Sequence, residues 1–171
     1  MKKIVSATVL SLVLITGNVF GQDKPLHEVY SMMVYNFVKY IQWPASSGSS
    51  EFVIGVVGNS EMFTTMHKWY NGSKIGTSTC IVKQFKSAED VSEAQVIFID
   101  RSKSGEFDEI NSKTKGKNTL IVTDKNGLGE RGSGINFKVV DSKLKFEINQ
   151  KAIEASHLKV AGSLTAMAIL I

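Results

Sequence analysis

A continuous apolar run, FVIGVVG at residues 52–58, decides the fold. Because its apolar side chains occupy successive rather than alternate positions, the run is typical of a β-strand buried on both faces. The polar residues 59–61 that follow predict a tight turn into a helix N-terminus. Two later runs, VIFID at 96–100 and TLIVTD at 119–124, repeat this design with helical patterns between them. The sequence therefore predicts an α/β fold: a mostly parallel, open, Rossmann-like sheet flanked by helices.

The segments around these runs predict the remaining elements. Apolar and polar residues alternate on either side of Asp141-Ser142, which predicts a β-hairpin with one buried face. Trp43-Pro44 ends the first helical pattern, because the residue before a proline is pushed out of the helical conformation. We expect helices at residues 26–41, 60–70, 105–113, 150–156 and 158–171, a strand at 78–85, and hairpin strands at 135–140 and 143–149.

The first 21 residues have the pattern of a secretory signal peptide. Lys2 and Lys3 precede an apolar stretch at residues 4–15, and Gly21 ends a cleavage site. The apolar stretch is short for a membrane span, which favours a cleaved signal peptide. The alternative is that the segment is retained as an N-terminal membrane anchor. Cleavage would leave one domain, residues 22–171, as an exported periplasmic protein with a net charge of +2. So small a charge does not indicate a nucleic-acid partner.

The first predicted helix is apolar over most of its circumference. Such a helix is either deeply buried in its own domain or shared with a partner or a second copy of the chain. The candidate interface residues at and after this helix are Met32, Tyr35, Val38, Tyr40 and Trp43.

A glycine-rich segment at residues 127–134 predicts a surface loop with Glu130 and Arg131 at its tip. Because binding residues are often carried on loops, these two side chains are further candidates for a partner contact.

Three polar residues lie at the ends of the predicted parallel strands. Asn59, Asp100 and Asp124 each stand at or just after the carboxyl end of a buried run. In an open α/β sheet this edge is where ligands bind, so the three residues form a candidate ligand or cation site. Aspartates at these positions also cap helices and loops, which is the structural alternative.

Other reactive residue types form no recognisable catalytic or metal-binding pattern. The histidines His27, His67 and His157 are too far apart for a metal-ligand motif, and the sequence predicts no metal or cofactor. Cys80 is the only cysteine, so it has no intrachain disulfide partner. We expect a buried thiol, with an intermolecular disulfide or a reactive thiol as alternatives.

Several short motifs resemble those of the YfiR-like periplasmic family when taken in order. The C-terminal half contains GINF at residues 134–137, LKFEIN at 144–149 and LKV at 158–160. Near the N-terminus, YNF at 35–37 and WP at 43–44 are similar to the opening pattern of the family. The resemblance extends over nearly all of the expected mature chain.

The resemblance implies an exported α/β regulatory protein without enzymatic activity. The best-known member binds the periplasmic part of a membrane-bound diguanylate cyclase and so limits cyclic-di-GMP signalling and biofilm formation. By resemblance, the partner here is a membrane-bound signalling protein, either a diguanylate cyclase or a sensor kinase or receptor. The second hypothesis is a small-ligand sensor that uses the carboxyl edge of the sheet. Two departures stand out: Cys80 cannot form the family member's cysteine pairs, and His157 replaces a common glycine.

Overall fold

The computed structural model describes residues 24–44, 50–58 and 60–171. The expected signal peptide and Asn59 lie outside this part of the chain. The strands are β1 (Ile41–Gln42), β2 (Glu51–Val57), β3 (Lys74–Ile75), β4 (Ser78–Phe85), β5 (Val96–Ile99), β6 (Leu120–Thr123), β7 (Ile135–Val140), β8 (Lys143–Ile148), β9 (Lys159–Val160) and β10 (Ile169–Leu170). The helices are α1 (Leu26–Phe37), α2 (Ser60–Tyr70), α3 (Phe107–Thr114), α4 (Gln150–Ala155) and α5 (Gly162–Thr165), with 3₁₀ turns η1 (Val38–Tyr40) and η2 (Arg101–Glu106).

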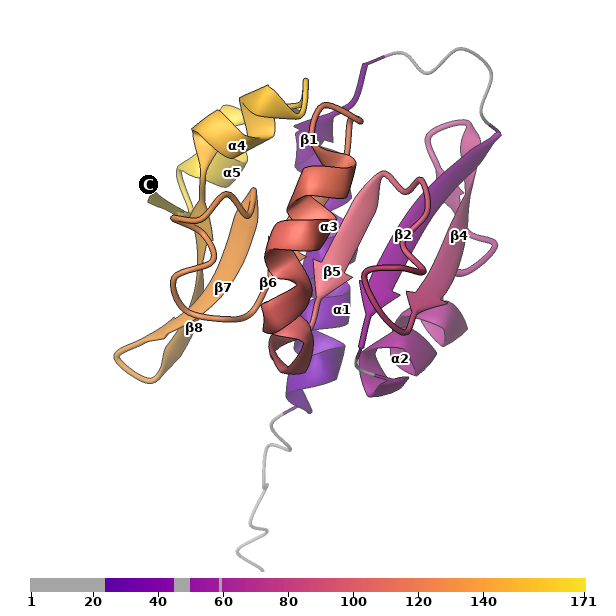
Figure 1. Cartoon of the computed structure of the whole chain (residues 1–171), viewed down its shortest axis with the longest axis horizontal. Helices are drawn as coiled ribbons and strands as arrows, with labels where there is room; N and C mark the ends of the chain where they lie inside the picture. Colours follow the sequence, from indigo (N-terminus) through magenta and orange to yellow (C-terminus); the bar gives the residue numbers. More distant parts are fainter. Residues whose placement is uncertain (1–23, 45–49, 59) are drawn as a thin grey trace, which may run out of the picture.

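A mostly parallel sheet forms the centre of the described chain. Eight of these strands pair in the order β10-β8-β7-β6-β5-β2-β4-β3 (Figure 1). The pairs from β4 through β2, β5 and β6 to β7 are parallel, and so is the pair of β8 with β10. β3 pairs antiparallel with β4, and β8 pairs antiparallel with β7. This arrangement confirms the predicted α/β fold.

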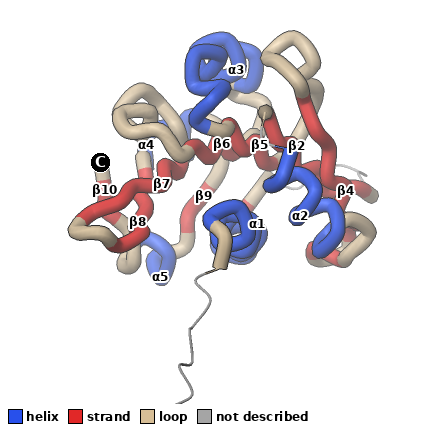
Figure 2. The backbone as a smooth tube through the Cα atoms, turned by 90° about the horizontal axis from the view of Figure 1, so that it is seen from below, coloured by secondary structure: helices blue, strands red, loops and turns tan. Residues whose placement is uncertain are grey.

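Helices cover both faces of the sheet, which explains the continuous apolar run in β2. Figure 2 shows α1 and α2 on one face and α3 on the other. Ile54 and Val56 pack in the core beneath α1 and α2, whereas Val53 and Val57 pack in the core beneath α3. A strand covered on both faces needs apolar side chains at successive positions.

The predicted hairpin is present with the predicted turn. β7 and β8 pair antiparallel, and Asp141 and Ser142 join them with φ angles of 50° and 58°. Positive φ at both central residues is the conformation of a type I′ turn, which matches the twist of the flanking strands.

Two of the predicted helices are wrong in part, the first at its C-terminal end and the last over most of its length. The first ends at Phe37, passes through a 3₁₀ turn and becomes strand β1, where Ile41 pairs with Val160. The segment 158–171 is helical only in α5, because β9 pairs with β1 and β10 pairs with β8 at the sheet edge. Partners distant in sequence therefore override the local helical pattern.

Candidate functional site

A pocket of about 330 Å³ lies at the carboxyl edge of the sheet, where the sequence predicts a ligand site. We call it the strand-end pocket. Its walls come from the first turns of α1 and α2 and from the residues directly after β5 and β6. It is lined by Leu26, His27, Tyr30, Glu61, Met62, Asp100, Arg101 and Asp124.

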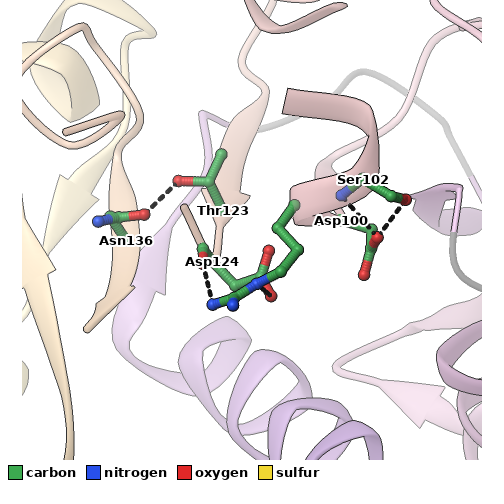
Figure 3. Close-up of polar contacts among 6 residues, drawn as sticks. Asp100, Ser102, Thr123, Asp124 and Asn136 are labelled. Carbon is green, nitrogen blue, oxygen red and sulfur yellow. Dashed lines mark hydrogen bonds and ion pairs between the residues drawn. The ribbon is translucent and has the colours of Figure 1, made fainter. Parts of the chain in front are cut away.

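Asp124 is the buried acid of this pocket, with only 4% of its surface exposed. Its Oδ2 accepts a hydrogen bond from Arg101 Nε at 3.2 Å, and its backbone oxygen accepts one from Arg101 Nη2 at 2.9 Å (Figure 3). Its Oδ1 is buried and has no hydrogen-bond partner within the part of the chain that the structure describes. One oxygen of a buried carboxylate is thus left without a donor, which costs stability.

Asp100, the second predicted acid, caps the 3₁₀ turn that follows β5. Its Oδ1 accepts hydrogen bonds from the backbone N–H of Ser102, at 2.9 Å, and from the Ser102 hydroxyl (Figure 3). The capping interpretation of this aspartate is therefore confirmed, and the cap also fixes Asp100 beside Asp124 at the pocket.

Burial and neighbouring charge shift two acid–base groups in the pocket. Burial raises the pKa of the Asp124 carboxyl, the nearby carboxylate of Asp100 raises it further, and Arg101 opposes the increase. Burial also raises the pKa of the Tyr30 hydroxyl to about 12, and the charge of Asp124 adds to this rise. Tyr30 therefore stays a neutral phenol in the physiological range, while ionised Asp124 is disfavoured relative to an exposed aspartate.

The described residues contain no group of three or more His, Cys, Asp and Glu side chains that could hold a metal ion. At the rim of the strand-end pocket, His27 Nδ1 lies 3.5 Å from Glu61 Oε2. The geometry is that of a small pocket with both polar and apolar walls and a buried acceptor.

The structure distributes the candidate interface residues of the first helix over different environments. Val38 is only 6% exposed and belongs to the core, which corrects its expected place on a contact surface. Tyr35 stacks on Tyr70 of α2, with ring centroids 3.9 Å apart. Met32 and Tyr40 are half-buried and keep part of their surface toward solvent.

One known protein family matches nearly the whole described chain. Residues 27–169 match the model of the YfiR/HmsC-like family, which is 143 of the 171 residues. The protein belongs to the YfiR/HmsC-like family. No curated protein matches the chain significantly. The family supports a regulatory rather than an enzymatic role.

The structure describes both residues at which this YfiR/HmsC-like protein departs from the expected pattern, Cys80 and His157. Cys80 is buried without exposed surface, and burial raises the pKa of its thiol to about 11. The expectation of a buried thiol is confirmed. His157 directly follows α4's C-cap with a φ of 56°, a left-handed conformation that glycine adopts without strain. The histidine therefore keeps the backbone conformation that a glycine would favour.

The glycine-rich segment of this YfiR/HmsC-like protein is partly buried, and its tip is exposed. Leu128 and Ser133 are buried, whereas Glu130 and Arg131 are exposed. Arg131 Nη2 donates to Asp108 Oδ2 of α3 at 2.6 Å, so the tip lies on the face of the sheet opposite α1. The structure therefore does not bring the two halves of the predicted interface together.

Sequence reasoning missed a larger groove of about 790 Å³ at the opposite, amino edge of the sheet. Trp43 borders it, and its ring lies edge-on against Phe52 at 5.0 Å between centroids. The lining comes from segments far apart in sequence, so no motif indicates it. It is lined by Trp43, Pro44, Glu51, Phe52, Ser78, Val91, Ser92, Glu93, Ala94, Gln95, Lys113, Thr114, Lys117, Asn118 and Thr119.

Proposed function

We propose that this protein is an exported regulator that binds the periplasmic part of a membrane-bound signalling protein. The observation that carries this proposal is the YfiR/HmsC-like family match over residues 27–169. The partner is a diguanylate cyclase, or a sensor kinase or receptor with an exported domain. The protein acts by binding and not by catalysis, and in this way controls cyclic-di-GMP signalling and biofilm formation.

A binding protein regulates its partner only through different affinities for the partner's active and inactive states. Two exposed surfaces are candidates for this contact. The first is the outer side of α1 and the segment that follows, with Met32, Tyr40 and Trp43. The second is the loop tip with Glu130 and Arg131. Because they lie on opposite faces of the sheet, one flat partner surface contacts only one of them. We favour the first, because aromatic side chains and methionine are enriched in interfaces.

Photo-crosslinking in intact cells tests the proposal. A photoreactive residue at Asn36, which is exposed on α1, probes the first surface, and one at Glu130 probes the second. Lys151 is exposed on α4 and serves as the control position. We expect a membrane signalling protein in the adduct from Asn36 and not from Lys151.

The outcomes separate the alternatives. The same membrane protein captured only from Glu130 would move the contact to the loop tip. Adducts between two copies of the chain would identify α1 as a homodimer interface. If neither position captures a membrane protein when both proteins are present, the regulator proposal fails.

A further inference from the structure

The strand-end pocket has an acceptor without a donor. Asp124 lines the pocket, its residue surface is 4% exposed, and Oδ1 has no hydrogen-bond partner among the described residues. Buried polar atoms are almost always hydrogen-bonded, so an orphaned one has a specific reason. A ligand that carries a hydrogen-bond donor would satisfy Oδ1 directly.

The charges around this oxygen indicate the sign of the ligand. The carboxylates of Glu61, Asp100 and Asp124 outnumber the single guanidinium of Arg101 in the pocket lining. The positive N-terminal ends of α1 and α2 are offset by acids in their first turns, Glu28 and Glu61. The pocket therefore favours a cation over an anion.

The surroundings also distinguish an organic cation from a metal ion. Calcium takes six to eight oxygen ligands and magnesium demands octahedral coordination. The described residues contain no cluster of three or more metal-ligating side chains. Leu26, Tyr30 and Met62 instead give the pocket an apolar wall that suits an alkyl group. Its volume of about 330 Å³ is near the lower limit of small-molecule sites and excludes a folded partner.

We propose that the strand-end pocket binds a small alkylammonium ligand, whose N–H group donates to Oδ1 of Asp124 while its alkyl part lies against Leu26, Tyr30 and Met62. The Arg101 side chain, which is 63% exposed, already occupies Oδ2 and leaves Oδ1 for the ligand. Because Oδ1 is buried, a ligand reaches it only when a neighbouring side chain moves, and we assign this movement to the exposed Arg101 side chain. The inference is independent of the membrane partner proposed above, because it concerns the purified protein alone.

Calorimetric titration and thermal unfolding with n-butylammonium chloride test the inference. n-Butanol is the neutral control of the same shape, and sodium chloride at equal ionic strength controls for screening. We expect n-butylammonium to bind saturably and to raise the melting temperature, because a ligand that binds only the folded state stabilises it. n-Butanol and sodium chloride should not reproduce the effect.

Three variants locate the binding. Asp124→Asn should weaken n-butylammonium binding at least tenfold, whereas Asp108→Asn, which removes the carboxylate of an exposed arginine pair, should leave it unchanged. Arg101→Ala should bind at least as tightly as the original protein, because a competing cation is removed.

Equal affinity in the original protein and Asp124→Asn would overturn the inference. Equal effects of n-butanol and n-butylammonium, or loss of binding in Arg101→Ala, would do the same. No binding of n-butylammonium at millimolar concentration would also refute it. None of these results bears on the membrane partner.

Discussion

Replacing Asp124 by asparagine should stabilise the protein at neutral pH. The substitution keeps the shape of the side chain and removes a buried charge. An unsatisfied buried group costs about 1–3 kcal/mol when it is neutral and more when it is charged. The amide still leaves a polar atom at the Oδ1 position, so only the excess cost of the charge is removed. The variant also loses the ion pair between the buried Asp124 and Arg101. Because the Arg101 side chain is 63% exposed, we expect this loss to cost no more than about 1 kcal/mol. We therefore expect a net gain of about 1 kcal/mol, or about 2–4 °C in melting temperature for a chain of this length.

The pH dependence of this gain follows from the raised pKa of Asp124. Between the ordinary pKa of an aspartate and this raised value, the folded protein binds more protons than the unfolded chain. Stability contributed by Asp124 therefore falls as the pH rises through this interval. The advantage of Asp124→Asn should be complete above the raised pKa and should disappear below the ordinary one.

Thermal unfolding followed by circular dichroism from pH 3.5 to 8 measures both effects, with Asp108→Asn as the control. Asp108 also pairs with an arginine, but its side chain is 73% exposed, so its replacement should give no gain. If Asp124→Asn is less stable than the original protein at pH 7, the Arg101 pair outweighs the burial cost and our reasoning is wrong. A difference that does not vary with pH would contradict the raised pKa.

Three further predictions concern the backbone and the thiol. His157→Gly should raise the free energy of unfolding by about 0.5–1 kcal/mol in denaturant titrations, because a left-handed residue costs about 1–2 kcal/mol and glycine's flexibility returns part of that; an unchanged or lower value would show that the histidine is not strained. Gly129→Ala should lose about 1–3 kcal/mol, because a Cβ there would lie 2.7 Å from Glu147 Oε2, whereas Gly105→Ala meets no atom within 4 Å and should be near neutral; equal effects of the two substitutions would argue against the close contact. Cys80 should react with a thiol reagent only as fast as the protein unfolds, because its thiol is buried and its pKa is raised to about 11; rapid labelling of the native protein would contradict this.

Local patterns were sufficient for the central part of the fold. The side chains of β2 are apolar on both faces of the strand because helices cover both faces. This run of successive apolar residues is visible in the sequence. The turn at Asp141-Ser142 follows from the alternation on either side of it. The capping role of Asp100 was also predictable from its position after β5, and its side chain caps the 3₁₀ turn that follows.

Features that depend on distant partners could not be predicted in the same way. Ile41 continues a helical pattern but pairs with Val160, more than a hundred residues later. The C-terminal residues become a strand because β8 offers an open edge. Among the candidate site residues, Asp124 was identified, but the sequence shows neither that Arg101 pairs with its Oδ2 nor that its Oδ1 has no partner among the described residues.

The terminal strand has a practical consequence for handling the protein. β10 is the outermost strand beside β8, and the N–H of Ile171 donates to the carbonyl of Ile148 at 3.1 Å. Trimming residues 169–171 would uncover the backbone of β8, and an uncovered edge strand is a template for aggregation. An affinity tag fused directly after Ile171 would begin one residue beyond β10, at the edge of the sheet. Tags are therefore better placed between the expected cleavage site after Gly21 and α1, and a fusion after Ile171 needs a flexible spacer.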